Sequence, residues 1–392
     1  MILKKEFLDL AKDIYGPGSI PLHRPVFEGN EKHYLVECID SNFVSSVGEK
    51  VNQFENLVAD FTGSKFAVAT VNGTAALHVS FELAGVLPGD EVISQALTFI
   101  ATCNAISYCD AVPVFIDVDL DTMGMSPHSL KAFLEVHAEK RDGKVFNKIS
   151  GRRIAACVPM HTFGLPCRIA EIADVCADWG IALIEDAAES LGSYVGRQHT
   201  GTFGAMGTLS FNGNKVITTG GGGMLVTDDP YLAKKAKHIT TTAKVAHTYE
   251  FDHDEIAFNY RLPNLNAALG CAQMERLQEF LSIKASLSNR WCEFFKDQSV
   301  KFIRPIEGCS ANYWLNAIVL ESKSDRDEFL EYTNSNGVMT RPIWKLMPTL
   351  KMFEDCQTDG LKNSRWLYDR VVNIPSSVPK DALTKWENGK NL

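Results

Sequence analysis

The sequence lacks any apolar run long enough to cross a membrane. A transmembrane helix needs about 20 predominantly apolar residues, and the longest uncharged stretch near the middle of the chain, residues 92–109, is interrupted by hydroxyl and amide side chains. The first ten residues carry Glu6 and Asp9 and are followed by no signal-like cleavage site. We therefore expect a cytoplasmic protein with no membrane contact.

The chain also lacks an excess of positive charge and any cysteine spacing typical of metal sites. Lys and Arg number 39 against 48 Asp and Glu, which gives a net charge of −9 and disfavours nucleic acid as a partner. None of the ten cysteines forms a CxxC or CxC pair, so no zinc or iron–sulfur site is expected. A small anionic ligand is still compatible with this charge, because it needs only a local cluster of donors.

Strand and helix patterns alternate between residues 50 and 230 of this 392-residue chain. Such alternation predicts parallel βαβ units with helices on both faces of one sheet. Ligands of these sheets bind beyond the carboxyl ends of the strands. The predicted strands are residues 66–70, 91–94, 112–116, 153–159, 181–184 and 224–227, and the predicted helices are residues 75–84, 98–108 and 169–179.

Two other regions depart from this alternation. Residues 136–152 are polar and rich in Lys and Arg, and we interpret them as a solvated surface insertion. After Tyr260 the pattern changes, and Pro263-Asn264 can begin a long amphipathic helix. The shorter mixed elements that follow indicate a smaller second domain.

Lys215 is the first candidate for chemistry. It ends the segment SFNGNK at residues 210–215 and precedes four glycines, Gly220 to Gly223. A lysine amine can form a Schiff base with a carbonyl if burial or a neighbouring charge keeps it partly neutral. Most lysines are simply solvated, and a glycine run can be only a flexible turn, so this segment alone is weak evidence.

Asp186 follows the predicted strand at residues 181–184 and precedes Ala187. Burying a carboxylate there costs several kcal/mol unless a cation or strong donors meet it. The side chain could cap a helix or form an ion pair. Alternatively, it could be the counter-ion of a protonated ring nitrogen.

Two further segments lie at junctions between predicted strands and helices. Asn72-Gly73-Thr74-Ala75 stands where a helix N-terminus could bind phosphate, although it could equally be an ordinary N-cap. Phe99 opens the next helix and could stack on a flat ligand or belong to the core. A phosphate cradle, a ring stacker, an acid and a lysine are together what pyridoxal phosphate requires.

With these residues in place, the sequence resembles the DegT/DnrJ/EryC1/StrS family of sugar aminotransferases, which are fold-type I pyridoxal-phosphate enzymes. The similarity extends from Ile20 to about Pro375. Its most specific stretches are residues 72–77, 98–105, 185–190, 210–215 and 259–264. The resemblance implies an α/β fold like that of aspartate aminotransferase, with a large domain at residues 1–255, including an N-terminal segment at 1–25, that contains a mixed, mostly parallel sheet. It also implies a small α+β domain at residues 256–392.

The resemblance also implies roles for the matching positions. Lys215 would hold the cofactor covalently and Asp186 would pair with the pyridine nitrogen. Phe99 would stack on the ring, where many relatives have Trp. The other implied cofactor contacts are Gly73, Thr74, Ala75, Asn104, Glu189, Ser210 and Asn212, with Asn259 supplied by the second subunit of a homodimer. Glu189 and Asn212 stand where relatives often carry other residues.

The implied activity is transfer of an amino group from glutamate to a nucleotide-linked keto sugar. SFNGNK and the 136–152 insertion resemble the subgroup that aminates C4 of UDP-4-keto-6-deoxy-N-acetylhexosamine, for bacillosamine or legionaminic-type surface glycans. Arg341 and Trp344 would then contact the substrate, unless they serve only domain packing. His161 also matches a family motif, and we assign it no catalytic step.

Three alternatives remain open from the sequence. The substrate could be a GDP- or dTDP-linked sugar or a 3-keto sugar. A dehydratase of the same fold would replace the lysine or add an iron–sulfur cluster, and Lys215 and the cysteine spacing argue against both. A non-catalytic sensor of sugar nucleotides would need no lysine, and this chain retains it.

Overall fold

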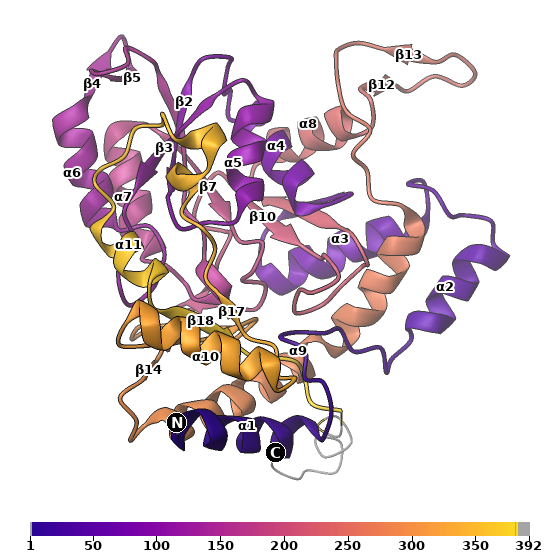
Figure 1. The fold of residues 1–392 in the computed structure, drawn as a ribbon. Helices are drawn as coiled ribbons and strands as arrows, with labels where there is room; N and C mark the ends of the chain where they lie inside the picture. The colour runs from indigo at the N-terminus through magenta and orange to yellow at the C-terminus, as the bar shows by residue number, and fades with distance from the viewer. Residues whose placement is uncertain (1, 381, 383–392) are drawn as a thin grey trace.

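The computed structural model describes residues 2–380 and 382, and a seven-stranded sheet lies at its centre (Figure 1). Strand β11 is antiparallel to both of its neighbours, β1 and β10, whereas the remaining pairs are parallel. The strands, in spatial order, are β1 (Phe66–Thr70), β11 (Gly223–Thr227), β10 (Met206–Ser210), β7 (Ala182–Asp186), β6 (Ile154–Val158), β2 (Glu91–Gln95) and β3 (Val112–Ile116).

Helices cover both faces of this sheet. One apolar cluster joins the sheet to α4 (Gly73–Leu83), α5 (Ile100–Tyr108) and α8 (Pro230–Thr240). A second cluster joins it to α6 (Pro127–His137) and α7 (Ile169–Trp179). The expected strand–helix alternation is therefore confirmed. Strand β10 escaped prediction because its sequence, MGTLS, contains a glycine and few β-branched residues.

Residues 136–152 are not the plain solvated loop that their composition indicated. After α6 ends at His137, β4 (Ala138–Arg141) and β5 (Lys144–Asn147) form an antiparallel hairpin. Val145 packs in the cluster under α6 and α7, and Asn147 is fully buried. The Asn147 amide donates to Glu91 Oε2 and to Gln357 Oε1, both at 2.7 Å. The two buried residues at alternate positions of β5 therefore make this segment a partly buried hairpin, despite the surrounding lysines and arginines.

The C-terminal part is organised around α9 (Asn264–Phe295), which begins at the predicted residue (Figure 1). Below the central sheet lies a four-stranded antiparallel sheet in the order β14 (Lys301–Phe302), β16 (Asn316–Val319), β18 (Val371–Ile374), β17 (Arg341–Pro342). The N-terminal helix α1 (Ile2–Tyr15) shares an apolar cluster with this region, in which Phe7 lies 5.2 Å from Trp291 between ring centroids. The division of the chain at residue 255 remains a prediction.

The remaining elements lie around these two sheets. The helices are α2 (Glu31–Asp40), α3 (Glu49–Thr62), α10 (Lys323–Ser335) and α11 (Lys362–Tyr368), with 3-10 turns at Thr162–Gly164, Met347–Thr349 and Lys351–Phe353. The short strands are β8 (Tyr194–Val195), β9 (Gln198–His199), β12 (Lys244–Val245), β13 (Asp252–His253) and β15 (Cys309–Ser310). None of the helices in residues 2–380 is long and apolar enough to span a bilayer.

The carboxyl ends of β1, β10, β7 and β2 meet at one edge of the central sheet, because these strands run in the same direction. Gly223 allows the turn after β1 to pack closely at this edge. Gly223 is the first residue of β11 and pairs with Thr70. A Cβ atom at Gly223 would overlap the backbone of Asn72 and Gly73. The turn that follows β1 can therefore lie against the glycine run only while position 223 has no side chain.

We predict that Gly223→Ala destabilises the protein by about 1–3 kcal/mol, the usual cost of overpacking. The added methyl must displace the turn at Asn72. Gly221→Ala is the matched control, since the nearest atom to a Cβ at that position is the Val71 carbonyl oxygen at 3.8 Å. Urea denaturation of the three proteins measures the difference, and equal losses for both variants would contradict the steric explanation.

Candidate active site

The turn after β1 forms an anion-binding arrangement. Asn72 caps α4, with its Oδ1 accepting from the Ala75 N–H at 2.8 Å. The N–H groups of Gly73 and Thr74, in the first turn of α4, have no hydrogen-bond partner among the described residues. A Cβ at Gly73 would lie 3.0 Å from the Ser210 Cβ, so the helix end approaches the end of β10 closely. Free N–H groups and a nearby hydroxyl are what a phosphate requires.

Asp186 is the last residue of β7 and is 2% exposed. Thr102, on α5, donates to its Oδ2 at 2.6 Å, and the Ala188 N–H donates to its Oδ1 at 3.2 Å. Burial raises the pKa of Asp186, while these two donors and the charge of Lys215 oppose the rise. A second cationic group beside Oδ2 would stabilise the ionised form further.

Lys215 lies between a carboxyl group and an indole ring. Its Nζ donates to Glu189 Oε1 at 3.2 Å and lies 4.0 Å from the centroid of the Trp314 ring. The Trp314 Nε1–H in turn donates to the Asn214 carbonyl at 2.6 Å, which anchors the ring to the residue before Lys215. The lysine amine is thereby held at the sheet edge by a charge and by the face of a π system.

Glu189 is the second buried carboxyl group of the site. Besides Lys215, its partner is the Phe163 N–H, which donates to Oε2 at 2.9 Å. Phe163 has a φ of 58°, a left-handed conformation that costs a non-glycine residue on the order of 1–2 kcal/mol. Burial raises the pKa of Glu189 to about 7, against the opposing effects of the Lys215 charge and the Phe163 N–H.

Aromatic rings gather beside the predicted stacking residue. Phe99, the N-cap residue of α5, is 46% exposed at the sheet edge. The Trp344 ring lies 6.1 Å from the Phe99 ring and 4.9 Å from the Phe163 ring, between centroids. The structure thus brings Trp344, from the C-terminal part of the chain, to the predicted site.

The other predicted site residues are more exposed and make fewer contacts. Asn104 lies half-buried one turn further along α5, and Asn212 is exposed and donates weakly to Asn214 Oδ1 at 3.4 Å. Asn259 is exposed on the segment that follows the β12–β13 hairpin. Arg341 is exposed on β17, and its side chain makes no hydrogen bond or ion pair with any residue in the described range.

His161 has a structural environment. Its Nε2 lies 3.0 Å from Glu185 Oε2, and the Cys167 N–H lies 3.3 Å from its Nδ1, with all three side chains fully buried. Burial lowers the pKa of His161, but Cys167 and Glu185 outweigh burial and raise it to about 10. Both ring nitrogens are therefore engaged within the fold.

Two site residues were missed by sequence reasoning. Trp314 is 99 positions from Lys215 and stands in no recognisable motif, so only the packing of the C-terminal part reveals its contact. Thr102 lies in the similar stretch 98–105, but a threonine inside a predicted helix gives no sign that its hydroxyl meets Asp186. The strand–helix order could have suggested Thr102, whose helix follows a strand near β7.

The residues present fit pyridoxal phosphate. The free N–H groups of Gly73 and Thr74 suit its phosphate, the under-compensated Asp186 carboxyl suits a ring N–H, and Lys215 suits its aldehyde. The charge of Lys215 lowers the pKa of Asp186, although burial has the larger and opposite effect. Gly73 and Ser210 lie close together. The space at the N-terminus of α4 stays open to a ligand only because neither position carries a larger side chain.

Comparison with known proteins gives a match over most of the chain. Residues 26–382 match the model of the DegT/DnrJ/EryC1/StrS aminotransferase family. EpsN of Bacillus subtilis (strain 168), whose name assigns it provisionally to the pyridoxal phosphate-dependent aminotransferases, is 37% identical over 95% of this chain and 94% of its own. GDP-perosamine synthase of Vibrio cholerae is 33% identical over 91% of this chain and 94% of its own.

Solved structures show the same fold. The crystal structure of the aminotransferase TlmJ from Streptoalloteichus hindustanus has a TM-score of 0.82 and 25% identity, over 92% of this chain and 94% of its own. The expected α/β architecture with a mixed, mostly parallel sheet is therefore confirmed.

The raised pKa of Glu189 predicts a pH dependence of stability in the cofactor-free protein. The native state favours the protonated form, so this contribution is complete below about pH 4.5, the ordinary value, and is lost as the pH rises through about 7. We predict that the free energy of unfolding of the wild type falls by about 2–4 kcal/mol across this range relative to Glu189→Gln, which cannot ionise. Urea denaturation at several pH values measures this; parallel profiles for the two proteins would contradict it.

Proposed function

This chain belongs to the DegT/DnrJ/EryC1/StrS aminotransferase family, and from this premise we propose how its own residues act in sugar amination. The enzyme is a sugar-nucleotide aminotransferase and its cofactor is pyridoxal phosphate. The observation that carries the proposal is the meeting of Lys215, Asp186 and the α4 N-terminus at one edge of the sheet. The cofactor supplies an aldehyde and an electron-withdrawing ring.

The protein residues divide the remaining work. The N–H groups of Gly73 and Thr74, with the Ser210 hydroxyl, bind the phosphate at the positive end of α4. The Asp186 carboxylate, held by Thr102, accepts the ring N–H and keeps that nitrogen protonated. Phe99 would stack on the ring of the cofactor, and Ala75, Asn104 and Asn212 would supply further contacts to it.

The amine of Lys215 has two tasks. It would hold the aldehyde carbon of the bound cofactor between turnovers, and as a free amine it would accept a proton from the Cα atom of glutamate. Positioned proton transfer of this kind contributes about 10²–10⁴-fold to a rate. Glu189 is the group that receives the released lysine, since its Oε1 already lies 3.2 Å from Nζ. The same residues acting in reverse deliver the amino group to the keto sugar.

The substrate follows from similarity rather than from the site geometry. We propose a nucleotide-linked 4-keto-6-deoxy sugar, aminated at C4, with Arg341 and Trp344 on its side of the site. The sequence motifs favoured a UDP-linked N-acetylhexosamine. The GDP-perosamine synthase of Vibrio cholerae, similar over 91% of the chain, favours a GDP-linked sugar instead, and we take guanine as the expected base.

We also propose a homodimer in which Asn259 completes the partner's site. Large apolar side chains are exposed on two surfaces, the α2 region and the projecting β12–β13 hairpin (Figure 1). They are Val36, Ile39, Phe43, Val44, Val47, Tyr249, Phe251 and Ile256. Exposed apolar groups in such number favour burial against another chain, and Asn259 lies six residues after the end of β13.

Substitution at the two central residues tests the catalytic roles. We predict that Lys215→Ala abolishes turnover and the visible absorbance of the covalently held cofactor. Asp186→Asn should lower kcat by at least about 10²-fold while the free energy of unfolding changes far less, because the amide cannot hold the ring nitrogen protonated. Equal rates for Asp186→Asn and wild type would remove Asp186 from the mechanism.

Mixing inactive subunits tests the position of Asn259. If Asn259 acts on the partner's site, then Lys215→Ala subunits mixed and refolded with Asn259→Ala subunits restore roughly a quarter of wild-type activity, since half of the dimers contain one intact site. No restoration is expected if Asn259 acts on its own subunit's site. Each variant dimer alone is the control.

An amination assay tests the substrate. Purified holoenzyme with glutamate is offered GDP-, UDP- and dTDP-linked 3-keto and 4-keto sugars, and kcat/KM is compared. We expect the GDP-linked 4-keto-6-deoxy sugar to react at least about tenfold faster than its UDP counterpart. A preference for the UDP-linked N-acetyl sugar would contradict the proposed GDP-linked substrate and support the one that the sequence motifs favoured. Amination at C3 would contradict the proposed amination at C4.

A further inference from the structure

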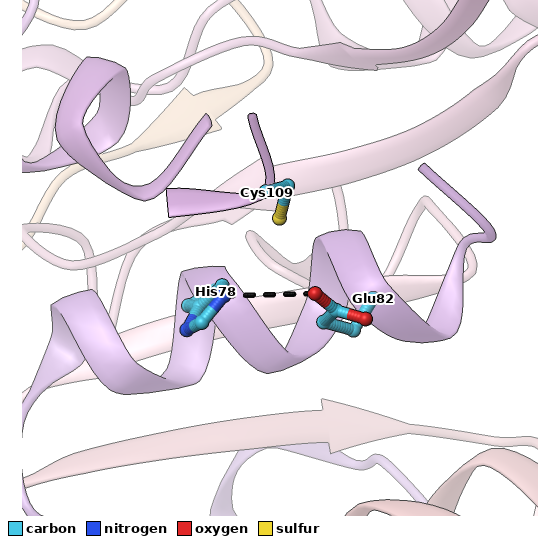
Figure 2. A group of neighbouring side chains, drawn as sticks. All are labelled: His78, Glu82 and Cys109. Atoms are coloured by element: carbon cyan, nitrogen blue, oxygen red, sulfur yellow. Dashed lines mark ion pairs between the residues drawn. The ribbon is translucent and has the colours of Figure 1, made fainter. Parts of the chain in front are cut away.

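Three side chains with metal-binding groups meet on the far side of the cofactor-binding helices. His78 and Glu82 stand four residues apart on one face of α4, and Cys109 is the C-cap residue that follows α5 (Figure 2). One ligand atom from each residue lies within 4.8 Å of the other two. In Figure 2 the sulfur atom of Cys109 points toward the face of α4 that carries His78 and Glu82.

The orientation of the His78 ring favours a ligand between these three side chains. Its Nδ1 lies 3.4 Å from the Tyr260 hydroxyl, and its Nε2 lies 3.7 Å from Glu82 Oε1. The ring is packed against Phe258, 4.7 Å away between centroids. A histidine that binds a metal through one nitrogen is usually held by a hydrogen bond at the other, and Tyr260 provides this hydrogen bond.

The three side chains of the cluster interact mainly with one another. His78 and Cys109 are 6% and 5% exposed. The thiol of Cys109 lies 3.6 Å from the Ala105 carbonyl oxygen, and it also forms a hydrogen bond with the Glu82 carboxyl group. No Lys or Arg in the described part of the chain forms an ion pair with Glu82. Burial raises the pKa of Cys109 to about 12 and the pKa of Glu82, and it lowers the pKa of His78.

We propose that His78, Glu82 and Cys109 bind one Zn²⁺ ion, which joins the C-terminal half of α4 to the end of α5. Imidazole nitrogen, thiolate sulfur and carboxylate oxygen are the three ligand types that zinc accepts, at roughly 2.0–2.3 Å. Ligand atoms in a tetrahedral zinc site lie about 3.3–3.7 Å apart, so small side-chain rotations close the present spacing. On binding, the thiol proton leaves to solvent and a Zn–S bond forms.

The fourth zinc ligand is water. The Glu82 side chain is 40% exposed and borders the solvent, so the ion can enter and exchange from that side. Three protein ligands and one open position describe an accessible site rather than a closed one. The ligands come from two helices and span 32 positions, which is why no cysteine spacing in the sequence indicated them.

A second acidic and histidine cluster carries no such proposal. His238, Asp254 and Glu255 also lie within reach of one another. They are explained without a metal, because His238 pairs with both carboxylates and Lys235 pairs with Glu255. That cluster also contains no sulfur ligand.

The position of the zinc site has a consequence for the enzyme. Helix α4 begins with the phosphate-binding residues Gly73 and Thr74, and α5 begins beside Phe99. A metal at the opposite ends of these helices would fix their relative position. It would therefore stabilise the folded holoenzyme by mass action without touching the reacting atoms.

Zinc titration of the holoenzyme tests the proposal. After chelator treatment, Zn²⁺ is added in competition with a chromophoric chelator, and the thermal midpoint is followed. We expect one tight Zn²⁺ per chain and a raised midpoint in the wild type. Cys109→Ala and His78→Gln should each weaken binding by at least about tenfold and abolish the thermal shift. Cys309→Ala, which removes a thiol outside the cluster, should behave as the wild type.

A spectroscopic measurement on the unaltered protein covers the case in which a variant fails to fold. Co²⁺ bound in this site should give intense d–d bands of tetrahedral geometry at wavelengths where the cofactor does not absorb, with one sulfur ligand by X-ray absorption. Weak octahedral bands, a sulfur-free coordination shell, or equal Zn²⁺ affinity in Cys109→Ala would each overturn the proposal.

Discussion

The site depends on one amine whose charge acts on two buried carboxyl groups. Lys215 Nζ contacts Glu189 at 3.2 Å and also lowers the pKa of Asp186, while burial raises the pKa of both acids. Neither carboxyl group is fully compensated by the protein alone. A cofactor that occupied the lysine and offered a ring N–H to Asp186 would compensate both carboxyl groups.

The fold places this arrangement where two parts of the chain meet. Asp186 and Glu189 follow β7, and Lys215 follows β10, whereas Trp314 belongs to the C-terminal part and contacts the lysine at 4.0 Å. The strained backbone of Phe163 directs its N–H to Glu189. Small residues allow these approaches, and Gly223 is the clearest case because a Cβ atom there would overlap the backbone of Asn72 and Gly73.

Sequence reasoning predicts the parts that local pattern determines. Short apolar runs in the sequence predict strands β1, β2 and β7. Gly73 and Asp186 are recognised as candidate site residues because each stands shortly after one of these runs. Contacts between distant segments do not follow: Trp314 meets Lys215, and Val145 and Asn147 turn a charged segment into a partly buried hairpin. Such contacts depend on tertiary packing, which a single sequence does not display. Family motifs supplied the roles that packing alone would have left unassigned.

The covalent position of the cofactor is the most direct test of this account. Lys284 is the instructive competitor, since burial lowers its pKa to about 7 and its Nζ contacts only the Trp314 and Ser376 carbonyls among the described residues. Borohydride reduction of the holoenzyme, followed by digestion and peptide mass spectrometry, locates the pyridoxyl group. We predict that it is found on Lys215. Its recovery on Lys284, or on any other lysine, would contradict the central claim.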